Sequence, residues 1–110
     1  MNYEVIPLPF FASQLKRLVK KFPSLRQEYA SLIAILETDP EQGTPLGNGC
    51  FKIRLAIASK GKGKRGGARV ITMVIHANQS VYMLTIYDKS EQPDITDKEL
   101  QALAKAATDH

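Results

Sequence analysis

The residues best suited to chemistry gather in a basic loop near the middle of the chain. Residues 59–69 read SKGKGKRGGAR, so glycines alternate with cations and no acidic residue interrupts them. Glycines let a backbone approach a phosphate closely, and Lys and Arg side chains form charge-assisted hydrogen bonds with phosphate oxygens. The acid-free segment 52–69 holds seven basic residues: Lys52, Arg54, Lys60, Lys62, Lys64, Arg65 and Arg69. This concentration of charge predicts an anionic partner such as a nucleic acid.

Two other interpretations of the loop have to be weighed. It does not match a nucleotide-binding P-loop, because GxxxxGK[ST] is absent and the loop is expected to join two strands. A solvated loop whose lysines only keep the protein soluble stays open, because charge runs usually lie on solvated surfaces.

Residues on either side of the loop favour binding over a solvated turn. Arg54 and Arg69 lie in expected strands that flank the loop, and Tyr87 and Lys89 end a later strand in IYDKSE. Taken singly, each arginine fits a strand residue with its charge in water, and Tyr87 fits a half-buried sheet aromatic. Together they predict one sheet face beside the loop that carries Arg, Tyr and Lys.

Such a set of side chains could bind a phosphodiester, and it could cut RNA without a metal ion if the chain has the activity that the family resemblance described below implies. Arginine would stabilise charge on the phosphorane-like transition state, and Lys or Tyr would have to move the protons. Their ordinary pKa values, about 10.4 and about 10, suit neither to act as a base near neutrality, so we expect neighbouring cations to lower them. His76, expected in mid-strand, is interpreted as structural or exposed. The weak acid–base set favours an enzyme in which substrate positioning supplies much of the rate.

Composition restricts the remaining classes. The 110 residues fit one domain, 1–110, and the 15 basic and 11 acidic residues leave a net charge of +4. Cys50 has no cysteine to pair with, and with His76 and His110 it cannot form a structural zinc site. No secretion signal or membrane span is recognised, so we expect a cytoplasmic protein without metal or cofactor. Asp94, Asp97 and Glu99 fit helix initiation better than metal binding.

The first half of the chain predicts one strand and two helices. Tyr3 to Ile6 suit a strand that stops at Pro7. Apolar residues then recur at helical spacing from Phe11 to Phe22 and again from Leu25 to Leu36. Ser24 with Gln27 reads as a capping box for the second helix, and a connection of about three residues predicts a helical hairpin. Residues 39–49, rich in Pro and Gly, predict a loop.

The second half predicts a meander of three strands and a final helix. In residues 51–58 large apolar side chains alternate with Lys, Arg and Ala, which puts Lys52 and Arg54 on the face away from the hairpin. Segments 70–77 and 81–87 are rich in β-branched and aromatic residues and are separated by a tight turn. Thr96 with Glu99 forms a second capping box before the last helix. The order β-α-α-β-β-β-α predicts an α+β fold with the hairpin packed on one face of a mainly antiparallel sheet.

The order of these motifs resembles a known family. FASQLKRLVKKFPSL, then KIR, SKGKGKRGGARVI and MLTIYDKSE, followed by a short helix, is similar to toxins of the RelE/ParE superfamily, closest to the HigB/RelE-type mRNA interferases. The resemblance spans nearly the whole chain and implies a RelE-like fold. It also implies the toxin of a type II toxin–antitoxin system, an endoribonuclease that cleaves mRNA on the ribosome. Its implied partners are that mRNA and a cognate antitoxin, expected to be a helix-turn-helix protein, with no membrane.

The resemblance also implies roles for individual residues. The active face would consist of Arg54, Arg69, Tyr87 and Lys89. The neighbouring cations would bind RNA: Lys52, Lys60, Lys62, Lys64 and Arg65. Two alternatives keep the charge but need no cutting centre: a non-catalytic nucleic-acid-binding module, and a ParE-like inhibitor of DNA gyrase.

Overall fold

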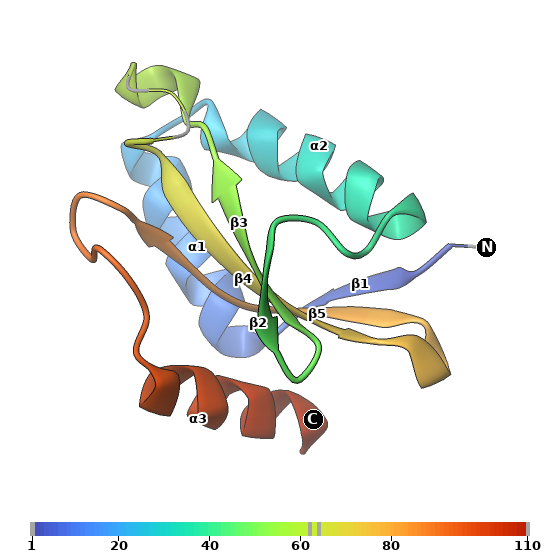
Figure 1. Ribbon diagram of the computed structural model, residues 1–110. Helices are drawn as coiled ribbons and strands as arrows, with labels where there is room; N and C mark the ends of the chain where they lie inside the picture. The colour runs from blue at the N-terminus through green and yellow to red at the C-terminus, as the bar shows by residue number, and fades with distance from the viewer. Residues whose placement is uncertain (1, 62, 64, 110) are drawn as a thin grey trace.

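The fold is built on one mixed sheet of five strands, seen in a computed structural model that describes residues 2–61, 63 and 65–109 (Figure 1). The sheet order is β1-β5-β4-β3-β2. β1 runs parallel to β5, and the other neighbours are antiparallel, so the predicted mainly antiparallel sheet is confirmed. The strands are β1 (Glu4–Pro7), β2 (Thr44–Gly47), β3 (Cys50–Leu55), β4 (Ala68–Ile75) and β5 (Ser80–Asp88).

Within the described residues, three α-helices cover the two faces of the sheet. α1 (Pro9–Lys21) and α2 (Leu25–Thr38) form the predicted hairpin and pack on one face, and α3 (Asp97–Thr108) packs on the other (Figure 1). Short 3₁₀ turns follow β3 at Ala58–Lys60 and β4 at His76–Asn78. The α+β order predicted from the sequence is therefore present, and α3 adds a third layer.

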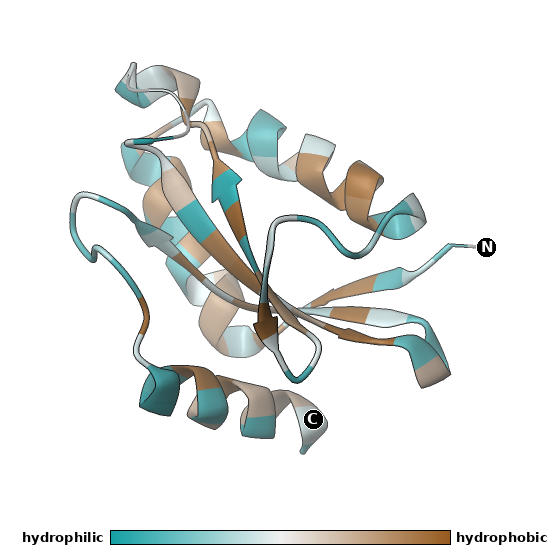
Figure 2. Cartoon of the chain, viewed as in Figure 1, coloured by the Kyte–Doolittle hydropathy of each residue, from teal (hydrophilic) through white to brown (hydrophobic). Residues whose placement is uncertain are grey.

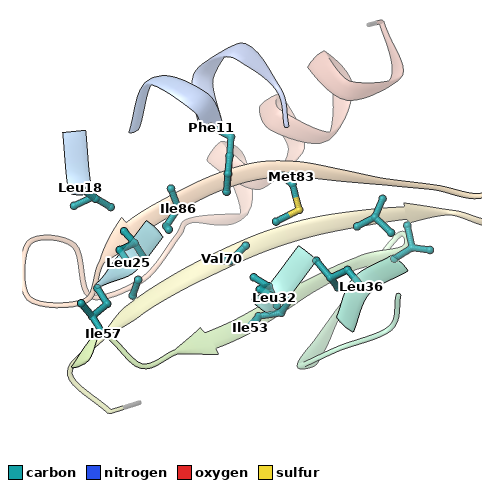
Figure 3. Close-up of a cluster of buried hydrophobic side chains, with 13 residues drawn as sticks. Phe11, Leu18, Leu25, Leu32, Leu36, Ile53, Ile57, Val70, Met83 and Ile86 are labelled. Atoms are coloured by element: carbon teal, nitrogen blue, oxygen red, sulfur yellow. The ribbon is translucent and has the colours of Figure 1, made fainter. Parts of the chain in front are cut away.

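The predicted apolar stripes of the two helices form the main core. Phe11 and Leu18 of α1 and Leu25 of α2 are fully buried, and Figure 3 shows them beside the sheet residues Met83 and Ile86. Each such side chain contributes about 1.5–3 kcal/mol through removal of its apolar surface from water. In Figure 2 the central strands are mostly hydrophobic, whereas the helices alternate between hydrophobic and hydrophilic residues. This burial holds the sheet residues of the candidate site in place.

One of the two predicted capping boxes is wrong. Thr96 caps α3 as predicted, because its Oγ1 accepts a hydrogen bond from the Glu99 amide at 3.1 Å and Glu99 Oε1 accepts one from the Thr96 amide at 3.1 Å. The Ser24 hydroxyl instead donates to Glu28 Oε1 at 3.2 Å and accepts from the Ser59 amide at 2.9 Å. Ser24 has helical dihedral angles and makes no side-chain cap. Its hydroxyl links Glu28 of α2 to the turn after β3 instead of capping the backbone of the helix.

Two local predictions in the strand regions are also wrong. β2 lies within the segment predicted to be a loop, where it pairs with β3 as an edge strand, a position that tolerates Pro45. His76 is not in mid-strand but begins the turn after β4, where its side chain is exposed. Its Nδ1 lies 2.6 Å from the Tyr3 hydroxyl and its Nε2 lies 3.2 Å from Glu41. No helix among the described residues is long and apolar enough to cross a membrane.

Candidate active site

Strand register places three of the predicted residues side by side. Arg54 of β3 pairs with Arg69 of β4, and Arg69 pairs with Tyr87 of β5. Directly opposed residues on neighbouring strands project to the same face, with Cβ atoms about 5 Å apart. We call Arg54, Arg69 and Tyr87 the Arg–Tyr row. The row lies on the sheet face that α3 also covers, because Tyr87 packs with Ile71 and Leu84 in the core cluster beneath α3.

Tyr87 keeps its phenolic proton in the folded protein. The residue is only 3% exposed, and its hydroxyl lies 3.5 Å from Asp94 Oδ1, which can accept its proton in a long hydrogen bond. Burial, reinforced by the negative charge of Asp94, raises the pKa of Tyr87 to about 12, against the opposing effect of Arg69. The expectation that nearby cations lower this pKa is therefore wrong, because desolvation outweighs them. At neutral pH Tyr87 carries its proton and can donate it.

The two arginines of the row have different surroundings. Arg69 is 3% exposed, and its guanidinium donates to the carbonyl oxygens of Ala68 at 3.1 Å and Arg65 at 3.2 Å. These bonds tie the start of β4 to the basic loop. Arg54 is exposed, and its side chain has no hydrogen-bond or ion-pair partner among the residues that the structure describes. Arg54 is thus available to a ligand, and Arg69 also organises the loop.

An acidic residue lies beside the row. Lys52, two residues before Arg54 on the same strand, places its Nζ 3.2 Å from Asp94 Oδ1. The same oxygen accepts a hydrogen bond from the Ile95 amide at 2.8 Å. The hydrogen bond from this amide lowers the pKa of Asp94 below its usual value, and the hydrogen bond from Lys52 is the second cause. The assignment of Asp94 to helix initiation is wrong, since α3 begins at Asp97, whereas Asp97 and Glu99 do lie in the first turn as predicted.

Lys60 lies in a buried ion pair instead of projecting from the loop. Its Nζ binds Asp88 Oδ1 and lies 3.0 Å from Ser90 Oγ and 5.4 Å from the centre of the Phe22 ring. The side chain of Lys60 is 7% exposed and that of Asp88 is 2% exposed. Burial alone would raise the pKa of Asp88, but hydrogen bonds from Lys60 and the Ser90 amide bring it below its usual value. The Lys60 charge is already balanced within the protein.

The other predicted cations lie around the loop or outside the described chain. Lys89 is half-buried, and its amide donates to the Gly67 carbonyl at 3.0 Å, which fixes its backbone beside the start of β4. Gly67 has to be glycine because a Cβ there would lie 2.2 Å from the Leu55 carbonyl oxygen. Arg65 is exposed. Lys62 and Lys64 lie outside the described residues.

The site as a whole combines cations with a protonated phenol. Arg54, Arg69 and Lys52 can stabilise an anion at one place on the sheet, and Tyr87 can donate a proton beside it. Sequence reasoning missed Asp88 and Asp94. Asp88 could have been found, because alternation at the end of β5 puts it on the hairpin face, where a carboxylate needs a cation. Nothing in the pattern around Pro93 indicated where Asp94 would lie.

Among the described residues, no group of three or more His, Cys, Asp and Glu side chains is arranged to hold a metal ion. The site described above is made of Arg, Lys and Tyr side chains, with Asp94 beside them.

Comparison with known proteins identifies the family. The fold matches free RelE toxin from Escherichia coli in a mutant form, with a TM-score of 0.64 and 16% identity over 96% of this chain and 98% of that one. It also matches the RelBE2 toxin–antitoxin complex of Mycobacterium tuberculosis, with a TM-score of 0.57 and 21% identity over 80% of this chain and 99% of that one. Residues 14–110 match the family model of the RelE toxin of the RelE/RelB toxin–antitoxin system. The chain belongs to the RelE family of toxins.

Proposed function

We propose that this chain is the toxin of a type II toxin–antitoxin pair and that it cleaves mRNA bound to the ribosome. The observation that carries the proposal is the Arg–Tyr row, in which register aligns two arginines with a protonated tyrosine. Membership in the RelE family supports the same activity, because these toxins are typically endoribonucleases. A toxin of this kind would act in the cytoplasm, where ribosomes translate.

The chemistry follows from the side chains. The ribose 2′-oxygen attacks the neighbouring phosphorus, the bond to the 5′-oxygen breaks, and the products are a 2′,3′-cyclic phosphate and a 5′-hydroxyl. Arg54 and Arg69 would stabilise the extra negative charge on the phosphoryl oxygens. Tyr87 would protonate the leaving 5′-oxygen, since an alkoxide is a stronger base than a phenolate. Lys89, two residues beyond Tyr87, is the remaining candidate to accept the 2′-hydroxyl proton, which requires its neutral amine; return of that proton to the Tyr87 phenolate, directly or through water, would then restore both groups.

Conservative variants test these roles without unfolding the protein. Tyr87→Phe keeps the buried ring but removes the proton, so cleavage should fall about 10²- to 10⁴-fold. Arg54→Met should lower cleavage about 10²-fold with little change in stability, because Arg54 is exposed. Arg17→Met is the matched control, because Arg17 is an exposed arginine of α1 that pairs with Glu91.

The readout is primer extension on transcripts from expressing cells, together with growth arrest and thermal unfolding of each purified variant. Full cleavage by both Tyr87→Phe and Arg54→Met would refute the assignment of the row. DNA-damage signalling without transcript cuts would indicate a gyrase inhibitor, and binding without either would indicate a non-catalytic module. The neighbouring reading frame adds an independent check, because a small helix-turn-helix protein there would be the expected antitoxin.

The outer surface of the helical hairpin suits that antitoxin. A groove of about 510 Å³ lies between α1 and α2, with Leu15 and Val19 in its floor and three cations on its rim: Lys16, Lys20 and Arg26. An apolar groove with a basic rim fits an acidic amphipathic helix. Lys16 and Lys20 reversed to Glu should abolish antitoxin capture. If reversal of Lys62 and Lys64 abolishes it instead, the antitoxin binds the basic loop.

A further inference from the structure

Three donors converge on one carboxylate oxygen beside the Arg–Tyr row. Asp94 Oδ1 lies 3.2 Å from Lys52 Nζ, 2.8 Å from the Ile95 amide and 3.5 Å from the Tyr87 hydroxyl. An ammonium group, a backbone amide and a phenol are also the kinds of group that bind phosphate oxygens in protein–nucleic acid contacts. Lys52 and Tyr87 therefore form an anion-binding site, and in this structure the bound anion is the carboxylate of Asp94.

This site adjoins the Arg–Tyr row, where the proposed function places the RNA backbone. Lys52 and Arg54 share one face of β3, and Arg69 lies opposite Arg54 in the register. An anion between Lys52 and Tyr87 thus lies at the edge of the surface proposed to bind the scissile phosphate. The phosphate whose 5′-oxygen Tyr87 is proposed to protonate would meet the donors that Asp94 now occupies.

The contact of Asp94 is of a kind that a ligand can displace. The side chain of Asp94 is 63% exposed and that of Lys52 is 27% exposed. Asp94 belongs to the segment that runs from β5 to α3 outside any helix or strand (Figure 1). Exposed ion pairs are weak because water screens them and both side chains lose freedom. The Lys60–Asp88 pair shows the opposite case in the same chain, since both its side chains are buried.

We propose that Lys52 and Tyr87 form a phosphate subsite for RNA and that Asp94 occupies it in the unbound toxin as an intramolecular competitor. This inference rests on the proposed function, because it assumes that the substrate is RNA. Asp94 then lowers the affinity of the free protein for RNA, and a phosphate group has to displace its carboxylate from Lys52. The loss of Asp94 therefore strengthens RNA binding.

The test measures binding without cleavage. A fluorescent 2′-O-methyl RNA hexanucleotide has no free 2′-hydroxyl to attack, so fluorescence anisotropy reports affinity alone. Asp94→Asn should tighten binding about two- to fivefold, the range expected from release of one exposed ion pair. Glu91→Gln is the matched control: it removes one charge from the same segment, but Glu91 pairs with Arg17 and Lys21, not with Lys52. It should tighten binding much less.

A second variant distinguishes competition from a general charge effect. In a Lys52→Met background, Asp94→Asn should no longer tighten binding, because the subsite it vacates has lost its main cation. Equal effects of Asp94→Asn and Glu91→Gln would overturn the proposal. Weaker binding by Asp94→Asn would also overturn it, because Asp94 would then be a residue that positions Lys52. A hexanucleotide that binds none of the variants would overturn it as well. The cleavage assay with Tyr87→Phe and Arg54→Met tests the proposed function separately, so the two failures can be told apart.

Discussion

Replacement of Lys60 by methionine should destabilise the protein strongly, because it leaves a buried carboxylate without its main partner. Loss of one member of a buried ion pair costs about 3–5 kcal/mol. Asp88 would keep the Ser90 amide at 2.9 Å, and the half-exposed Lys21 Nζ at 4.0 Å could move closer. We therefore expect a loss of about 2–3 kcal/mol in the free energy of unfolding. Methionine keeps an apolar stem beside Phe22.

Urea unfolding at neutral pH measures this loss, with Lys98→Met as the control for an exposed lysine. Asp88→Asn should also destabilise, and the double variant should lose less than the sum of the single losses, because each single change removes the same interaction. A Lys60→Met variant as stable as the control, but with weaker RNA binding, would refute this reasoning. Lys60 would then be an RNA contact, as the sequence suggested.

The acid limb of the stability curve provides a second readout. The pKa of Asp88 is lower in the folded protein than its ordinary value, so the folded state holds this carboxylate charged where the unfolded chain already binds a proton. The stabilisation is therefore complete above about pH 4 and is lost as the pH falls through the folded value. In Asp88→Asn the free energy of unfolding should fall less steeply as the pH is lowered. An unchanged acid dependence in this variant would contradict the pairing of Asp88 with Lys60.

Three further outcomes are expected from local geometry. Gly67→Ala should lower the free energy of unfolding by about 2–4 kcal/mol, because its Cβ would lie 2.2 Å from the Leu55 carbonyl oxygen. Gly61→Ala, which is in open space with a φ of 72°, should lower it by about 1 kcal/mol. Equal losses in the two variants would show that the clash at Gly67 is not the cause. Thr72→Val should stabilise by about 1 kcal/mol, because Thr72 Oγ1 is buried without a hydrogen-bond partner in the described chain, and a lower melting temperature would contradict this. Tyr87 has its pKa raised to about 12, so the unfolded chain ionises first and stability should fall from about pH 10 to 12, less steeply in Tyr87→Phe.

Much of the fold could be predicted because each element carries its own signal. The helical spacing of Phe11, Leu18 and Leu25 predicted the hairpin, and alternation in β3 predicted which face it covers. β2 was missed because Pro45 and its glycine neighbours read as a loop, and only the edge position makes a strand acceptable there. The nearly continuous apolar run VITMVI over residues 70–75 could have revealed the third layer, since a strand that is apolar on both faces must be covered on both.

The candidate site was predicted only as far as strand geometry extends. Alternation placed Arg54, Arg69 and Tyr87 on one face because side-chain direction in a strand follows from position alone. The partners of these residues depend on the paths of loops, which carry no periodic pattern. That is why Asp94 was assigned to helix initiation and why the ion pair of Lys60 with Asp88 was not predicted. The pKa of Tyr87 was predicted in the wrong direction because the sequence shows the nearby charges but not the burial.

Two consecutive residues at the end of β5 connect the basic loop with the Arg–Tyr row, because they project to opposite faces of the sheet. Tyr87 projects toward α3 and Asp94, and the next residue, Asp88, projects toward α1 and holds Lys60 at the first end of the basic loop. Arg69 holds the other end through the Arg65 carbonyl. Both ends of the loop are thus anchored to strands, and the exposed residues between them contribute charge without holding the fold. Variants can therefore separate the electrostatic role of the loop from its role in stability. Reversal of the exposed Arg65 should weaken RNA binding with little loss of stability, whereas any change at Lys60 alters both.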